Sequence, residues 1–176
     1  MTLARAPAAA LALAALVSGC STVTESAGRP VARAGIDEGM TFYLVGQLFI
    51  EAPTAWTASG DARRLRIDSP RGDARIEVVA ASRPAASESE CLADAEAMLA
   101  RGTAGLTGVR RHPTTFAGRP AITQEADQGA WHGWAYGVCD GPRQYRIWFS
   151  GLSPMGKDLI EAHALLVSRA RFEAGP

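Results

Sequence analysis

The sequence has few of the residues on which metal, redox and nucleotide sites depend. It contains three cysteines and three histidines in 176 residues, and the histidines fall in separate predicted elements. It has no CxxC pair for redox chemistry and no glycine-rich loop for phosphate. Scattered histidines do not provide the ligand spacing of a zinc site. We therefore predict neither a metal nor a cofactor.

Neither sign of charge is in excess. Lysine and arginine together number 18, as do aspartate and glutamate, so the formal net charge is +0. A protein that binds nucleic acid typically carries a basic surplus, because phosphate contacts dominate such binding. The balance argues against nucleic acid as a partner.

The chain also lacks a hydrophobic run long enough to cross a bilayer. The apolar run 8–17 follows Arg5 and is shorter than the roughly 20 residues that a transmembrane helix needs. The segment Val17-Ser18-Gly19-Cys20 resembles the lipobox of bacterial lipoproteins. This resemblance implies that residues 1–19 are a signal peptide and that Cys20 carries the lipid, palmitate included. The alternative is an ordinary secretory signal followed by a chance cysteine.

The predicted location is the bacterial cell envelope. Several acyl chains on Cys20 would anchor the chain stably to a membrane, with the domain facing the periplasm. Under the enterobacterial sorting rule, aspartate after the lipidated cysteine favours the inner membrane. Ser21 occupies that position here, so we expect the outer membrane. The expected partners are the membrane, through the lipid, and an envelope protein whose identity the sequence does not reveal.

Two cysteines remain once Cys20 is assigned to the lipid. Cys91 and Cys139 form an even pair in an oxidising compartment, which predicts one disulfide. In the chain-entropy model, closing a loop of this length stabilises the fold by roughly 4 kcal/mol. The alternative is two independent buried thiols.

Composition divides the mature chain into a tether, one domain and a tail. Residues 20–39 are rich in small and polar residues and poor in apolar ones, which predicts a flexible tether. Residues 40–172 have the size and apolar content of a single globular domain. Residues 173–176 form a short C-terminal tail.

Hydrophobic periodicity predicts several strands and two helices in this domain. Extended segments are expected at residues 41–50, 63–68, 75–81, 109–116, 119–127, 131–139 and 143–150. Short turns between most neighbours predict hairpins. Ser87 and Glu90 have the spacing of a capping box for the first helix, and Gly102 is its expected C-terminal cap. A last helix is expected from Ser153-Pro154 to near Phe172.

The segment 131–139 indicates how the helices pack. Small residues alternate there with bulky ones: Gly133, Ala135, Gly137 and Cys139 against Trp134, Tyr136 and Val138. The small face would let the first helix approach closely, and the bulky face needs apolar cover from the last helix. Hairpin-linked strands imply a mainly antiparallel sheet. We predict an α+β fold with helices on both faces of the sheet, a three-layer sandwich.

Two short motifs carry a family resemblance. Phe49-Ile50-Glu51-Ala52-Pro53 is followed by Trp56, and Ala117-Gly118-Arg119-Pro120-Ala121 forms a predicted hairpin turn. With the order of elements, these motifs resemble the PsbP/Mog-like fold, including DcrB-like envelope lipoproteins, over residues 40–172. The resemblance implies binding or assembly roles without a shared catalytic centre, and it transfers no functional residue to this chain.

His132 is the best candidate for a catalytic residue. With Asp127 or Asp140 and a serine such as Ser150, it would imitate a hydrolase triad. No nucleophile elbow or comparable motif positions a serine, so we assign no catalytic residue. His163 lies on the apolar stripe of the last helix and is expected to be a packed core histidine.

Basic and aromatic side chains suggest a binding surface. Its predicted members are Arg110, Arg111, Trp131 and His132. We predict a non-enzymatic envelope lipoprotein that binds another protein during envelope assembly or maintenance. One alternative is a carrier of a small ligand or glycan, which needs a pocket between sheet and helix. The other is a small envelope hydrolase that uses His132.

Overall fold

The computed structural model describes residues 31–34, 39–81 and 84–173. The predicted signal peptide 1–19 and the lipidation site Cys20 lie outside the described residues. Within the described part of the chain, no helix has both the length and the apolar character needed to span a membrane.

The larger of two sheets has seven strands in the order β4-β5-β6-β10-β9-β8-β7, with antiparallel neighbours throughout. The strands are β4 Thr57–Gly60, β5 Arg64–Asp68, β6 Ala74–Ala80, β7 Thr107–Phe116, β8 Arg119–Gln128, β9 Trp131–Asp140 and β10 Arg143–Leu152. The predicted hairpins β5-β6, β7-β8 and β9-β10 are confirmed. The contact between β6 and β10 joins segments far apart in the chain.

The smaller sheet has the order β1-β2-β3-β11. Its strands are β1 Val31–Ala34, β2 Met40–Val45, β3 Leu48–Pro53 and β11 Arg171–Phe172. The single strand predicted for residues 41–50 is therefore wrong, because a hairpin turn divides it. Gly46 makes this turn with a φ of +61°, a conformation that other residues rarely adopt. A Cβ there would also lie 3.0 Å from the Tyr145 hydroxyl oxygen.

Strand β1 lies inside the range 20–39 that composition assigned to a flexible tether. Its pairing with β2, from Val31 opposite Leu44 to Ala34 opposite Thr41, accounts for the difference. A polar segment gains order when a neighbouring strand edge supplies partners for its backbone. The predicted domain range 40–172 encloses every element from β2 to β11.

Helix α1 spans Glu88–Arg101 and begins as the capping box predicts. The Glu90 backbone N–H donates to the Ser87 hydroxyl at 3.2 Å, while the Glu90 carboxylate accepts from the Ala86 N–H at 2.6 Å. Gly102 is the C-terminal cap. These local bonds satisfy backbone groups that have no partner within the helix.

Helix α2 spans Lys157–Arg169, so the predicted start at Ser153-Pro154 and end near Phe172 are both wrong. At the start, the backbone N–H groups of Leu152 and Ser153 still donate to carbonyls of neighbouring strands and turns. At the end, Phe172 belongs to β11, which pairs with β3. Sheet hydrogen bonds therefore shorten the helix at both ends.

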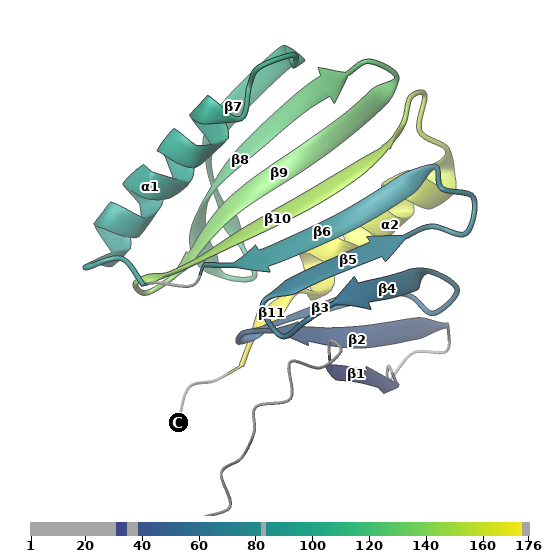
Figure 1. The fold of residues 1–176 in the computed structure, drawn as a ribbon, viewed down its shortest axis with the longest axis horizontal. Coiled ribbons are helices and arrows are strands. Elements are labelled where there is room, and N and C mark those ends of the chain that lie inside the picture. Colours follow the sequence, from purple (N-terminus) through teal and green to yellow (C-terminus); the bar gives the residue numbers. More distant parts are fainter. Residues whose placement is uncertain (1–30, 35–38, 82–83, 174–176) are drawn as a thin grey trace, which may run out of the picture.

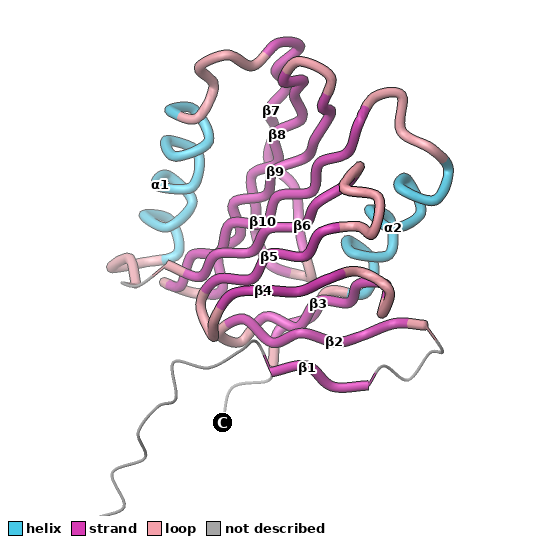
Figure 2. The backbone as a smooth tube through the Cα atoms, turned by 45° about the vertical axis from the view of Figure 1, so that its right-hand side comes forward, coloured by secondary structure: helices cyan, strands magenta, loops and turns pink. Residues whose placement is uncertain are grey.

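The two helices contact different sides of the large sheet (Figures 1 and 2). Helix α1 packs on β8, β9 and β10 so closely that a Cβ on Gly137 would lie 2.8 Å from the Ala95 Cβ. Helix α2 contacts β3 and stacks His163 on Trp134 of β9, which points away from the Gly137 side. The prediction of an α+β fold with a mainly antiparallel sheet is confirmed.

Cys91 at the start of α1 and Cys139 at the end of β9 are joined by a disulfide, with their Cα atoms 6.0 Å apart. Both residues are fully buried. This bond is compatible with the expected pairing and ties the start of the helix to the sheet. The main core lies on the other side of the sheet, between α2 and the two sheets.

Candidate functional site

The face of the large sheet that carries α1 is only partly covered. Helix α1 packs mainly on β8, β9 and β10, and the rest of this face lies open beside it (Figure 1). Two adjoining hollows of about 360 Å³ and 350 Å³ occupy this open area. We call them together the open-face groove. Its main side chains are Arg64, Arg66, Arg75, Glu77, Trp131, Arg146, Trp148 and Ser150.

The two hollows meet at β6 and β10. Glu77 and Arg146 line both of them, so the two hollows adjoin at these side chains. Residue alternation explains this arrangement: Arg146 and Trp148 face the groove, whereas Ile147 between them is fully buried in the core. Each hollow has the volume of a small-ligand pocket, which is typically ~300–1,000 Å³.

One end of the groove is aromatic. Trp131 and Trp148 are both half-buried and line the same hollow. The ring of Trp148 lies over Gly133 of the neighbouring strand, where a Cβ would come within 3.3 Å of the ring atom Cζ2. Glycine at this position therefore lets the indole lie against β9. The same ring packs at its other side on the small apolar cluster beneath α1.

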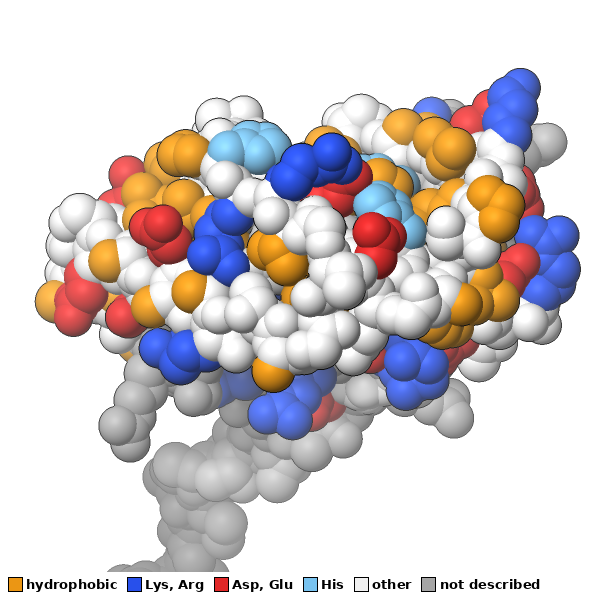
Figure 3. All heavy atoms as spheres, turned by 90° about the horizontal axis from the view of Figure 1, so that it is seen from above, with side chains coloured by type: hydrophobic (Ala, Val, Ile, Leu, Met, Phe, Trp, Pro, Cys, Tyr) orange, Lys and Arg blue, Asp and Glu red, His pale blue; other side chains and the backbone are white. Residues whose placement is uncertain are grey.

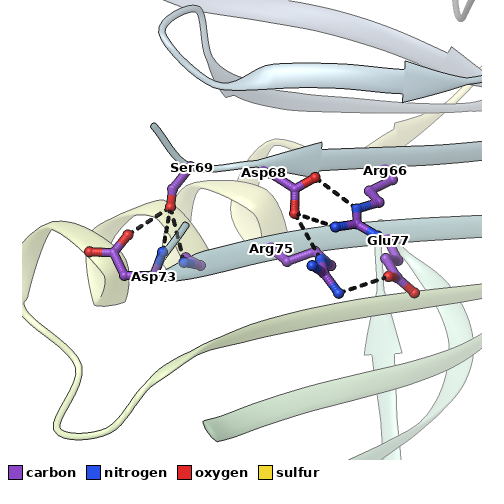
Figure 4. A network of polar contacts seen from close by, with 7 residues as sticks. Arg66, Asp68, Ser69, Asp73, Arg75 and Glu77 are labelled. Atoms are coloured by element: carbon purple, nitrogen blue, oxygen red, sulfur yellow. Dashed lines mark hydrogen bonds and ion pairs between the residues drawn. The ribbon is translucent and has the colours of Figure 1, made fainter. Parts of the chain in front are cut away.

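A network of ion pairs on β5 and β6 borders the groove, and its members Arg75 and Glu77 line the same hollow as the two tryptophans (Figure 4). Asp68 accepts from Arg66 at 2.7 Å and from Arg75 at 2.8 Å, and Arg75 lies 3.7 Å from Glu77. The hydrogen bond from Arg66 is the main cause that holds the pKa of Asp68 below its usual value. The carboxylate therefore stays charged and holds both guanidinium groups in place.

The turn between β5 and β6 is fixed by a second set of bonds (Figure 4). The Ser69 hydroxyl donates to Asp73 at 2.6 Å and accepts from the backbone N–H groups of Asp73 and Ala74. The bond from Ser69 is the largest cause that lowers the pKa of Asp73. This turn sets the register that brings Asp68 opposite Arg75.

Arg64 and Arg146 differ from the other two arginines of the groove. Among the described residues, no carboxylate lies within ion-pair distance of either guanidinium group. Both side chains are exposed. The groove thus holds four arginines against Glu77 and Asp68, a formal excess of two positive charges. Arg146, between the hollows, is the cation best placed to meet a ligand.

The structure divides the predicted binding surface between the two faces of the sheet. Trp131 and His132 both border the aromatic hollow, but the His132 ring turns to the other face and lies edge to face with the Trp134 ring at 4.6 Å. Arg110 pairs with Glu125 at 2.6 Å, and His132 contacts the same carboxylate at 3.2 Å. Figure 3 shows histidine side chains beside acidic and basic ones on one end of the molecule.

The remaining predicted residue, Arg111, donates to the amide oxygen of Gln124 on the α1 side of the sheet. It therefore joins neither the groove nor the cluster around His132. The four predicted residues are two pairs of sequence neighbours, Arg110 with Arg111 and Trp131 with His132. Because neighbours along a strand point to opposite faces, the four side chains form no single patch.

The hydrolase triad is not assembled. The Nδ1 atom of His132 lies 2.7 Å from Asp127, and its Nε2 atom lies 3.2 Å from Glu125. Each ring nitrogen therefore contacts a carboxylate, and neither contacts a serine hydroxyl of the residues that the structure describes. Ser150 pairs with Gly133 in the sheet and lies on the opposite face. Asp140 is engaged by Arg119 at 2.9 Å. Among the described residues, no cluster of metal-ligating side chains occurs.

Around His163, the interface between the sheet and the last helix is filled by side chains. The rings of Trp134 and His163 stack at 4.0 Å, and the Tyr136 hydroxyl lies 2.9 Å from His163 Nε2. Burial raises the pKa of Tyr136 to about 12 and lowers that of His163 to about 4. The expectation that His163 is a packed histidine agrees with these contacts. A third hollow, of about 310 Å³, lies beside the start of α2 and is lined by Trp56, Leu159 and Ala162 among others.

Sequence reasoning missed Arg75 and Arg146 as members of a site. Their alternation with buried residues was a usable signal that they share one face of their strands. The missing information was that β6 and β10 are neighbours, because this pairing spans a long stretch of chain.

The fold is that of a PsbP-like α+β domain. It is similar to the solution structure of cyanobacterial PsbP (CyanoP) from Synechocystis sp. PCC 6803, with a TM-score of 0.53. The likeness covers 80% of this chain and 97% of that chain at 10% sequence identity. No protein-family model matches the sequence, and no curated protein matches it either.

Proposed function

We propose that the protein is a lipid-anchored, non-enzymatic binding module of the bacterial cell envelope. In this proposal Cys20 carries the lipid, the domain faces the periplasm, and the open-face groove is the contact surface. The observation that carries the binding role is the exposed Arg146 beside partly exposed indole rings, a combination that favours binding over core packing. The lipobox resemblance supports the location.

The expected partner is an envelope protein, in keeping with a role in envelope assembly or maintenance. Arginine and tryptophan are the side chains that most often dominate protein interfaces. A carrier of a small ligand or glycan is the second candidate, and the volumes of the two hollows favour it. The hydrolase gains no support, because His132 and Ser150 lie on opposite faces of the sheet.

Position-specific crosslinking of the lipidated protein in intact cells tests the contact surface. A photoreactive residue is placed at the exposed groove positions Gln128 and Ser59, and in a matched control at Ile160 on α2, which is 53% exposed. We expect one reproducible protein adduct from the groove positions and none from Ile160. Capture from Ile160 alone, or equally from all three positions, would remove the groove from the proposal.

A further inference from the structure

We infer that the open-face groove binds an acidic oligosaccharide, with sugar rings against Trp131 and Trp148 and an anionic group on Arg146. The inference rests on the proposed role of this groove as the contact surface. It goes further by naming the chemistry of the ligand: a polymer of rings that carries carboxylate or phosphate groups.

Charge complementarity is the first argument. Arg66 and Arg75 are held by Asp68, whereas Arg146 has no carboxylate within ion-pair distance among the described residues. A guanidinium group presents a planar fork of donors that matches a carboxylate or a phosphate. Arg146 lines both hollows, so an anion bound there would lie at the centre of the groove.

The aromatic end supplies the second argument. Trp148 follows Arg146 by two residues and faces the same side of the sheet, and its ring lies against Gly133. Trp131 lines the same hollow from the next strand. An indole offers an apolar face together with an N–H donor, which suits the apolar face and the hydroxyls of a pyranose ring.

The position of the groove within the sheet separates a glycan from an extended peptide. A peptide that adds a strand needs an edge with free backbone groups. Strands β6, β10 and β9 are interior strands, paired on both sides. Recognition at the floor of the aromatic hollow therefore depends on side chains, whereas the second hollow extends to the edge strand β4 at Ser59 and Gly60. Between an acidic glycan and an acidic peptide, the two tryptophans that line one hollow favour the ring-containing ligand.

Binding of defined oligomers to the full chain in detergent tests this inference. The probes are hexagalacturonate, neutral galactohexaose and hexaglutamate, followed by calorimetry and tryptophan fluorescence. We expect hexagalacturonate to bind at least tenfold more tightly than either of the others. Arg146→Gln should weaken its binding about tenfold or more, because a charge-assisted hydrogen bond is lost. Arg146→Lys should fall between, since lysine keeps the charge but loses the fork.

Two further variants complete the test. Trp131→Ala should weaken hexagalacturonate binding, whereas the matched control Arg110→Gln, an exposed arginine on the other face, should leave it unchanged. Thermal unfolding of each variant verifies that its domain is folded. If the Trp131→Ala variant does not fold, the Arg146→Gln variant alone decides whether the groove binds hexagalacturonate.

Several results would overturn the inference. Equal binding of hexaglutamate would mean that charge alone is recognised, and equal binding of galactohexaose would mean that Arg146 is not involved. A loss in Arg110→Gln as large as that in Arg146→Gln would mean a long-range charge effect. With no binding of hexagalacturonate at all, the acidic-glycan assignment fails, while the crosslinking pattern still decides separately whether the groove is a contact surface.

Discussion

His163 is a titratable side chain that the fold keeps neutral. It is half-buried beneath α2, where it stacks on Trp134 and contacts the Tyr136 hydroxyl. Burial is the main cause that lowers its pKa from 6.5 to about 4, with Glu125 raising it and His132 lowering it further to smaller extents. A histidine of this kind makes folding depend on pH.

The sign of that dependence follows from the direction of the shift. Because the folded-state pKa of His163 is depressed, the unfolded chain binds the proton more tightly. The stability is fully present above about pH 6.5 and is lost as the pH falls toward 4. We expect the free energy of unfolding to fall by roughly 2 kcal/mol between pH 7 and pH 5 from this group alone.

Denaturant unfolding of the wild type and of His163→Gln at both pH values measures this effect. The variant should be less stable than the wild type at pH 7 but should lose much less stability on acidification. Comparing the two proteins isolates the contribution of His163, because every other titratable group is retained in both. An equal loss in wild type and variant would show that His163 is not the source.

At the scale of elements, the approach of α1 to β9 depends on two small residues. Gly137 leaves no room for a side chain, because a Cβ there would lie 2.8 Å from the Ala95 Cβ and 3.4 Å from its Cα. The disulfide between Cys91 and Cys139 holds the start of the same helix. The helix therefore has little freedom to move away from the sheet.

Gly137→Ala should accordingly lower the free energy of unfolding by about 1–3 kcal/mol, the usual cost of overpacking a core. Adding Ala95→Gly should recover part of this loss, although glycine in a helix costs about 1 kcal/mol by itself. Thermal or denaturant unfolding of the two single variants and the double variant measures their coupling.

Gly102→Ala is the matched control for this pair. Its nearest neighbours would be backbone oxygens at 3.7 Å, and its φ of −79° suits alanine. Its stability should be unchanged or slightly raised. Additive effects of Gly137→Ala and Ala95→Gly would contradict the close contact.

At the scale of the whole molecule, the small sheet gathers both ends of the described chain. Strand β1 lies at one edge of this sheet and β11 at the other, whereas the groove lies on the large sheet. A lipid attached at Cys20 would therefore reach the domain through the small sheet.

Membrane attachment through Cys20 leads to a direct prediction. Cys20→Ala should move the protein from the membrane fraction to the soluble fraction, because acyl chains on that cysteine are the proposed anchor. Ser21→Ala, the matched control, should remain with the membrane. Fractionation of cells after an alkaline wash measures both. A Cys20→Ala variant that stays in the membrane fraction would contradict the proposed lipoprotein.

The sequence by itself determined the features that depend on neighbours in the chain. The hairpins, the capping box at Ser87 and the packed position of His163 follow from turn chemistry and periodicity. So does the division of β9 into a small face and a bulky face. Each of these involves residues a few positions apart, for which local propensity is a sufficient guide.

Only the tertiary structure decided which strands are neighbours. Alternation shows that Arg146 and Trp148 share a face, but the pairing of β6 with β10 is what brings them beside Arg75 and Glu77. The separation of Trp131 from His132 follows from the same pleat. The division of the strands between two sheets likewise depends on long-range contacts. Such contacts are selected by packing of the whole core, which no short segment encodes.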